Sequence, residues 1–195
     1  MKELYLIRHG RTEANDKKIY CGNADVPLST KGKEELLELK ENIIYPNCDL
    51  YITSGLIRAN ETLEIIKPNV KYLKYDSLQE YNFGEFTFKN YEDLKDDDSY
   101  KKWISDDTGD VSCPNGEDRN GFKKRILTGI NEIIEKYKKH DSVFIVCHGG
   151  VIATLMEIFF EGERNFYEWH PKNGNGYKII FSHNVISEYS SLTFH

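Results

Sequence analysis

Residues 4–15 of this 195-residue chain read LYLIRHGRTEAN, an apolar run that passes directly into an arginine, a histidine and a glycine. Residues 4–7 are apolar without alternation, which is typical of a strand covered on both faces of a sheet. Arg8 and His9 would then stand at the carboxyl end of that strand. A cation and an imidazole at such a place predict an anion site that contains a nucleophile or a proton carrier.

Strand and helix patterns alternate along the rest of the chain. This order favours a three-layer α/β/α sandwich with a mostly parallel central sheet, in one domain over residues 1–195. Further strands are expected at residues 49–53, 70–75, 142–147, 177–181 and 185–192, the last two as a hairpin around residues 182–184. Helices are expected at residues 29–45, 56–66, 117–139 and 151–160, with residues 8–27 as a loop.

Helical spacing identifies the faces that the helices should bury. In residues 29–45 the apolar side comprises Leu36, Leu37, Leu39 and Ile43. In residues 117–139 it comprises Phe122, Ile126, Ile130, Ile133, Ile134 and Tyr137.

Residues 86–116 differ in character, because aromatic side chains stand there among acidic ones, and we expect them to cap the active site. Two interpretations are equally open: a packed helix with a solvated face, or contact with a substrate. The acidic run at residues 92–98 is expected to be solvated. The aromatic residues concerned are Phe86, Phe88, Tyr91, Tyr100 and Trp103.

Composition excludes several classes of function. The net charge is -6, from 26 Lys and Arg against 32 Asp and Glu. The sequence lacks the basic stripe that is typical of nucleic-acid-binding proteins. The longest apolar stretch, residues 151–160, is interrupted by Glu157 and is too short to span a bilayer. The four cysteines form no C-x-x-C pair, which argues against zinc and favours a reducing, cytoplasmic location. They are Cys21, Cys48, Cys113 and Cys147.

Three expected strand ends carry the residues suited to phosphate chemistry. The first ends in Arg8-His9-Gly10, the second leads to Arg58 one turn into the next helix, and a later one ends in His148-Gly149-Gly150. Because the carboxyl ends of parallel strands share one edge of a sheet, these groups should converge. Arginines bind phosphoryl oxygens, and the amino end of a helix favours an anion. The set predicts a phosphoryl site in which one imidazole attacks and the other stabilises charge.

Cleavage of a phosphomonoester also needs a proton donor for the leaving oxygen. Glu80 and Glu85 are the candidates, and the residues alone do not separate them. Cys147 is interpreted as a small buried residue rather than a nucleophile. Lone histidines are interpreted as solvated or satisfied core groups, which covers His140, His170, His183 and His195.

Six segments, in order, resemble the histidine phosphatase superfamily and its phosphoglycerate-mutase-like fold. They are residues 6–15 (LIRHGRTEAN), 21–32 (CGNADVPLSTKG), 53–62 (TSGLIRANET), 78–85 (LQEYNFGE), 114–117 (PNGE) and 146–151 (VCHGGV). A single segment would be weak support, whereas six in the family's order are highly specific. Arg11 departs from the pattern, since glutamate is common there, and this should alter only the rim of the site.

The resemblance implies a role for each matching residue. His9 would be the nucleophile that becomes phosphohistidine, and Glu80 rather than Glu85 the proton donor. Arg8, Arg58 and His148 would bind the phosphoryl group. Substrate contacts are also implied for Asn15, Gly149 and the Cys21-Gly22 backbone. No metal ion or other cofactor is implied.

The same resemblance implies a phosphatase acting on a small phosphorylated metabolite, with no nucleic acid or membrane as partner and a homodimer left open. Mutases carry arginine and histidine directly after the acid, where this chain has Tyr81 and Asn82. Its length and residues 91–117 look like the alpha-ribazole phosphatases of cobalamin synthesis. The alternatives are a phosphoglycerate mutase, a broad sugar-phosphate phosphatase, and a non-catalytic module that binds a phosphorylated ligand.

Overall fold

A six-stranded sheet forms the centre of the computed structural model, which describes residues 1–42, 44–183 and 185–192. The strand order is β3-β2-β4-β1-β5-β6. The first four strands in chain order pair in parallel, and the last two pair antiparallel at one edge, so the sheet is mostly parallel as predicted. The strands are β1 (Glu3–Arg8), β2 (Leu50–Thr53), β3 (Leu73–Lys74), β4 (Ser142–Cys147), β5 (Gly176–Ser182) and β6 (Val185–Leu192).

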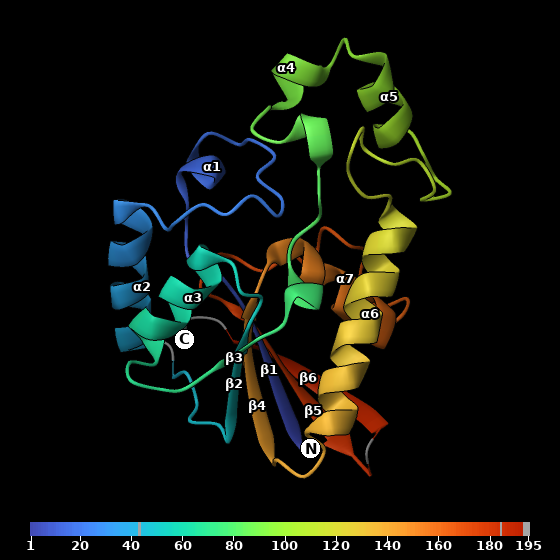
Figure 1. The fold of residues 1–195 in the computed structure, drawn as a ribbon. Coiled ribbons are helices and arrows are strands. Elements are labelled where there is room, and N and C mark those ends of the chain that lie inside the picture. The colour runs from blue at the N-terminus through green and yellow to red at the C-terminus, as the bar shows by residue number, and fades with distance from the viewer. Residues whose placement is uncertain (43, 184, 193–195) are drawn as a thin grey trace.

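Helices cover both faces of the sheet (Figure 1). Alternation along β1 divides the core: Tyr5 and Ile7 pack with α2 and α3, whereas Leu4 and Leu6 pack with α6 and α7. Both faces are therefore apolar, which explains the continuous apolar runs in the strands and confirms the three-layer sandwich. The helices that cover the sheet are α2 (Thr30–Asn42), α3 (Ile57–Ile66), α6 (Arg119–Lys136) and α7 (Gly149–Phe159).

Several local expectations were wrong. The expected loop at residues 8–27 contains a short helix, α1 (Glu13–Asp16), which Thr12 and Asn15 cap reciprocally. In α2 the side chain of Leu37 is exposed, because it lies about 100° around the helix from Leu36. The expected strand at residues 70–75 is only the two residues of β3. The predictions for Ile43 and for residue 184 of the hairpin turn lie outside the described residues.

Two 3-10 turns, η1 (Asp76–Leu78) and η2 (Gly84–Phe86), lead to α4 (Tyr91–Leu94) and α5 (Asp98–Ile104). Figure 1 shows α4 and α5 beyond the carboxyl ends of the parallel strands. Phe86 and Tyr100 are buried, so they pack as core groups, whereas Phe88 and Tyr91 are more than half exposed. Of the acidic run at residues 92–98, only Leu94 is buried, as expected of a solvated segment.

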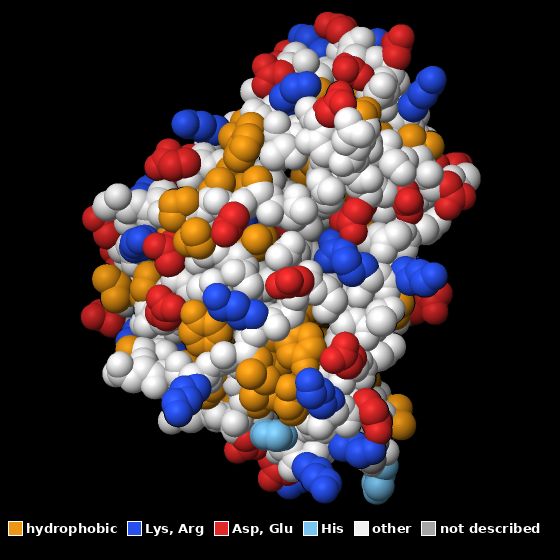
Figure 2. Space-filling view, viewed as in Figure 1, with side chains coloured by type: hydrophobic (Ala, Val, Ile, Leu, Met, Phe, Trp, Pro, Cys, Tyr) orange, Lys and Arg blue, Asp and Glu red, His pale blue; other side chains and the backbone are white. Residues whose placement is uncertain are grey.

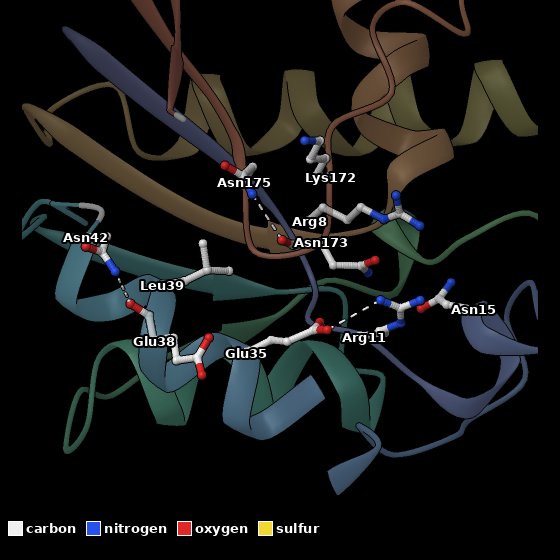
Figure 3. Close-up of a pocket in the computed structure, with 10 residues that line it drawn as sticks. All are labelled: Arg8, Arg11, Asn15, Glu35, Glu38, Leu39, Asn42, Lys172, Asn173 and Asn175. Carbon is white, nitrogen blue, oxygen red and sulfur yellow. Dashed lines mark hydrogen bonds and ion pairs between the residues drawn. The ribbon is translucent and has the colours of Figure 1, made fainter. Parts of the chain in front are cut away.

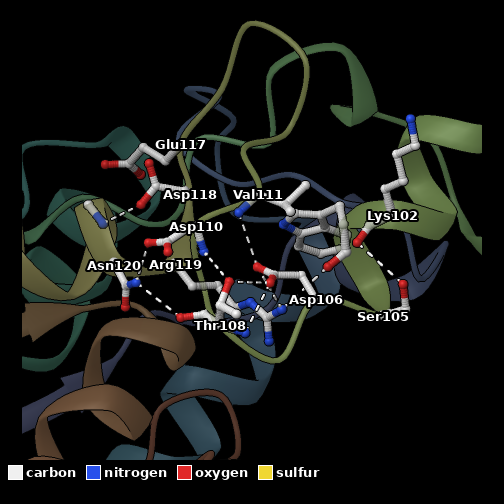
Figure 4. A network of polar contacts seen from close by, with 12 residues as sticks. Lys102, Ser105, Asp106, Thr108, Asp110, Val111, Glu117, Asp118, Arg119 and Asn120 are labelled. Atoms are coloured by element: carbon white, nitrogen blue, oxygen red, sulfur yellow. Dashed lines mark hydrogen bonds and ion pairs between the residues drawn. The ribbon is translucent and has the colours of Figure 1, made fainter.

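The loop between α5 and α6 is fixed by a polar network (Figure 4). The carboxylate of Asp106 accepts hydrogen bonds from the backbone N–H groups of Thr108 and Val111 and forms an ion pair with Arg119. Asn120 donates to the Thr108 carbonyl at 3.1 Å. These contacts hold the segment with α4 and α5 to the first turn of α6, in addition to its buried core residues.

The register of the central strands aligns three strand ends. Arg8 pairs with Cys147 across β1 and β4, and Thr53 pairs with Val146 across β2 and β4. The residues that follow, His9, Ser54 and His148, therefore emerge at one level. In Figure 2 acidic and basic side chains mix over the visible face. Within the part of the chain that the structure describes, no helix is long and apolar enough to cross a membrane.

Candidate active site

His9 follows β1 and is 5% exposed. Its Nδ1 lies 2.6 Å from the Gly10 carbonyl oxygen. Because a carbonyl can only accept, Nδ1 carries the hydrogen, and the Nε2 of the neutral ring keeps its lone pair. Burial, and then the cations of Arg58 and Arg8, hold the pKa of His9 well below its usual value. The geometry thus supplies a neutral imidazole with a fixed tautomer and a free nitrogen.

His148 caps the amino end of α7, and its ring centroid lies 5.2 Å from that of His9. Its Nε2 is 2.7 Å from the Ser54 hydroxyl. Its Nδ1 is buried and has no hydrogen-bond partner among the described residues. Burial is the main cause that holds the pKa of His148 well below its usual value, followed by Arg58 and His9. A neutral ring that accepts from Ser54 would present an Nδ1–H to an anion.

Arg8 and Arg58 bring two guanidinium groups to these histidines. Arg8 Nη1 donates to the Pro171 carbonyl at 2.8 Å, while its buried Nε has no partner among the described residues. Arg58 is 2% exposed and donates to the carbonyls of Ala24 at 2.7 Å and Gly22 at 2.6 Å. Burial lowers the pKa of both guanidinium groups, yet arginine remains charged in proteins. An anion here would offset the cost of two adjacent buried cations.

Thr62, one turn after Arg58 on α3, fixes the end of β1. Its hydroxyl accepts from the Gly10 N–H at 2.9 Å and donates to the Arg58 carbonyl at 2.6 Å. The backbone beside His9 is thereby tied to the helix that presents Arg58. A side chain buried between two elements in this way restricts the position of the imidazole.

Glu80 lies against the first turn of α7. Its Oε2 accepts from the Gly150 N–H at 2.9 Å and its Oε1 from the Tyr81 N–H at 3.0 Å. A Cβ at position 150 would come within 2.5 Å of Oε1, so only glycine allows this approach. Glu85, the other candidate acid, is exposed and instead accepts from Asn115.

Arg125 on α6 braces the segment that presents Glu80. It forms a bidentate ion pair with Glu117, with N–O distances of 2.8 and 2.9 Å. Its Nη1 also donates to the carbonyls of Ser77 and Gln79, both at 3.0 Å. Glu117 in turn binds the backbone after Glu80, because its Oε2 accepts from the Asn82 N–H at 2.9 Å. Both sides of Glu80 are therefore fixed to α6.

The other predicted substrate-binding residues lie around this centre. Asn15 uses its carbonyl oxygen to cap α1. Gly22 adopts a φ of 54° and approaches the Tyr81 carbonyl so closely that a Cβ would clash, which ties the Cys21-Gly22 turn to the Glu80 segment. Gly149 begins α7 beside His148. The structure thus brings every predicted site residue to one end of the sheet.

A pocket of about 540 Å³ adjoins the site between α2 and the loop at residues 172–175. Figure 3 shows Arg8, Arg11 and Asn15 at one end of this pocket and Leu39 and Asn42 at the other. Arg11 lines this pocket and forms ion pairs with Asp16 and Glu35. The pocket leaves room beside Arg8 for polar groups.

The sequence analysis gave no role at this site to four residues, Ser54, Thr62, Arg125 and His170. Ser54 and Thr62 stand inside quoted segments, but nothing in the sequence indicates their partners. Arg125 has the ordinary look of a charged helix residue. His170 was interpreted as a solvated or satisfied histidine, yet it lies against Arg8 because residues 164–175 return the chain to the end of β1. His195 lies outside the described residues.

The arrangement can bind a tetrahedral anion between two guanidinium groups and two neutral imidazoles, with a carboxyl group at the edge. Buried Cys147 has a raised pKa because of its burial, so its thiol is a poor nucleophile. Among the described residues, no group of three or more His, Cys, Asp and Glu is placed to hold a metal ion.

Comparisons with known proteins agree with this geometry. The adenosylcobalamin/alpha-ribazole phosphatase of Escherichia coli (strain K12) is 30% identical over 158 residues, 78% of this chain and 76% of that protein. A 2,3-bisphosphoglycerate-dependent phosphoglycerate mutase from Parvibaculum lavamentivorans is 28% identical, over 78% of this chain and 77% of the mutase.

Solved structures show the same architecture. The alpha-ribazole phosphatase of Shigella flexneri superposes with a TM-score of 0.84 at 25% identity, covering 98% of this chain and 95% of the other. The phosphoglycerate mutase of Bacillus anthracis gives a TM-score of 0.80 at 24% identity, covering 95% and 90%, and supports the fold alone. The family model described as histidine phosphatase superfamily (branch 1) matches residues 4–187. The chain belongs to this superfamily, whose members are phosphatases or mutases.

Proposed function

We propose that this protein is a phosphomonoesterase that acts through a phosphohistidine intermediate on a small phosphorylated metabolite. The observation that carries the proposal is the fixed tautomer of His9: Nδ1 is committed to the Gly10 carbonyl, and the free Nε2 belongs to a ring kept neutral by burial. Arg8 and Arg58 flank this ring, so that an attacking nitrogen and an anion site coincide.

In the first step, Nε2 of neutral His9 attacks phosphorus in line. The P–N bond forms, the P–O bond to the leaving group breaks, and protonated Glu80 gives its proton to the leaving oxygen. Arg8, Arg58 and the Nδ1–H of His148 hold the remaining phosphoryl oxygens. They are positioned before the reaction by Pro171, Gly22 and Ser54, which limits reorganisation.

In the second step, the Glu80 carboxylate removes a proton from water, the water oxygen attacks phosphorus, and the P–N bond breaks. Inorganic phosphate leaves and His9 is again neutral. The backbone N–H groups of Tyr81 and Gly150 hold the carboxyl group in place for both steps. Asn15 and the Cys21-Gly22 turn complete the wall of the site.

Hydrolysis is favoured over mutase activity by the residues after Glu80. Tyr81 is buried and donates from its hydroxyl to the Glu117 carbonyl, and Asn82 accepts from the Gly84 N–H. Neither brings a cation to the rim, where a mutase would hold a second anionic group of its substrate. Transfer of phosphate between the two glycerate positions of 3-phosphoglycerate, without net phosphate release, would instead support the mutase.

Alpha-ribazole 5'-phosphate is the first substrate to test, because two of the relatives above are named for alpha-ribazole. A panel that includes 3-phosphoglycerate and sugar phosphates separates this substrate from a broad specificity. The cytoplasmic location expected from the free cysteines stays a prediction.

The test of the reaction class is His9→Ala with p-nitrophenyl phosphate. We expect kcat to fall by roughly 10⁴-fold or more, since the only nucleophile is removed. The matched control is His183→Asn, in the turn between β5 and β6, which should retain wild-type turnover. Substantial residual turnover by His9→Ala would contradict the proposal.

A further inference from the structure

His170 stands at the mouth of the site and has no role in the mechanism above. It follows a turn at residues 165–169 and precedes Pro171, whose carbonyl accepts from Arg8. Its Nδ1 lies 3.3 Å from Arg8 Nη1. A guanidinium group can only donate, so Nδ1 accepts and the hydrogen of the neutral ring is on Nε2.

The remainder of the imidazole faces the amino end of α7. A Cβ built on Gly149 would lie 2.4 Å from Nε2 and 2.2 Å from Cε1 of His170, so this edge of the ring rests directly on the Gly149 backbone. The ring centroids of Phe166 and His170 lie 6.3 Å apart, with the two ring planes at 64° to each other. Nε2 is therefore held between Arg8 and the first turn of α7, where anions are favoured.

The charges around His170 act on its protonation. Burial and the Arg8 cation lower the pKa of His170, and the Glu80 carboxylate opposes them. A positive charge on His170 would lower the pKa of His9 further. Burial and the Arg8 cation thus favour the neutral form of His170, a residue that is exposed at the rim.

We propose that His170 is a further phosphate-binding residue, whose Nε2–H donates to a phosphoryl oxygen of the bound monoester. The role rests on the proposed phosphate site. Arg8 would then serve two purposes, because it binds the anion and fixes the tautomer of its neighbour.

Two replacements of different chemistry test this role. His170→Leu introduces an apolar side chain of similar size and removes the hydrogen-bond donor. His170→Gln retains an N–H donor at about the same distance from the backbone as Nε2. For His170→Leu we expect kcat/KM for p-nitrophenyl phosphate to fall about 10-fold, mainly through KM, and Kd for inorganic phosphate to rise in parallel. His170→Gln should restore both constants to within about 3-fold of wild type.

His183→Asn serves as the control, because this histidine lies in the turn between β5 and β6, away from the site. Unchanged phosphate affinity in His170→Leu would overturn the inference, and so would a His170→Gln variant as defective as His170→Leu. Calorimetry with inorganic phosphate needs no turnover. A wild-type protein that binds phosphate but hydrolyses no ester would therefore refute the proposed hydrolysis while leaving His170 open to the same test.

Discussion

His9 and His148 are two buried imidazoles beside two guanidinium groups, an arrangement that suppresses their protonation. For His9 this is required, because only the neutral ring has a lone pair on Nε2. For His148 a proton at Nδ1 alone is enough to donate to phosphate. The same burial that weakens basicity therefore keeps one ring nucleophilic and leaves the other a hydrogen-bond donor.

The lowered pKa of His9 predicts activity under mildly acidic conditions. Protonation of His9 would abolish attack, and this protonation occurs only well below the usual histidine value of about 6.5. We expect kcat/KM for p-nitrophenyl phosphate, whose good leaving group depends little on Glu80, to stay level from pH 7.5 down through 6.5. An acid limb centred near pH 6.5 would show that burial and the arginines do not depress the pKa of this ring.

Among the elements, the ends of β1, β2 and β4 supply the phosphate site, and α6 holds the proton donor in place. Arg125 lies 45 positions from Glu80 in the chain and acts through Glu117 and the carbonyls of Ser77, Gln79 and Glu80. Its effect should therefore be confined to the two proton transfers that Glu80 performs.

Arg125→Met should lower kcat/KM for an alkyl phosphate about 10-fold, because a mobile Glu80 protonates a poor leaving group less well. For p-nitrophenyl phosphate the loss should be smaller, roughly 3-fold or less. Glu80→Gln should show the same selectivity with a larger loss, roughly 10²-fold for the alkyl ester. The control is Lys124→Met, on the exposed side of α6. Equal losses on both substrates would indicate general damage rather than a positioning role.

The elements also show what could be predicted from the sequence. Apolar strands ending in Arg8-His9-Gly10 and His148-Gly149-Gly150 were predicted, because short buried strands and the chemistry that follows them are adjacent in the chain. The position of His170 was not, because it depends on how residues 164–175 return to β1. The contacts of Arg125 could not be predicted either, since the sequence does not show whether a charged helix residue binds water or a carbonyl.

At the scale of the whole molecule, the sheet places one chemical site at the edge between two packed cores. Buried neutral histidines make the stability of this fold depend on pH. The pKa of His9 and His148 is lower in the folded state than the value of about 6.5 expected in the unfolded chain. Below that pH the unfolded chain binds more protons, so stability falls as pH falls.

Each histidine should contribute a slope of about 1.4 kcal/mol per pH unit below pH 6.5. Urea unfolding at pH 7.5 and pH 5.5 should therefore show a loss of about 3 kcal/mol attributable to the pair. In the His9→Asn/His148→Asn double variant this part of the loss should disappear. Equal pH dependence in the two proteins would mean that neither ring is held neutral by the fold.

The central claim, that His9 carries the phosphoryl group, can be tested by trapping the intermediate. The protein is mixed with p-nitrophenyl phosphate, quenched in alkali, in which phosphohistidine survives, and cleaved after glutamate, so that residues 4–13 form a peptide whose only histidine is His9. We predict one phosphoryl group on His9, lost on acidification and absent from His9→Ala. Release of p-nitrophenol and phosphate without phosphorylation of His9, or with the phosphoryl group on another residue, would contradict the account.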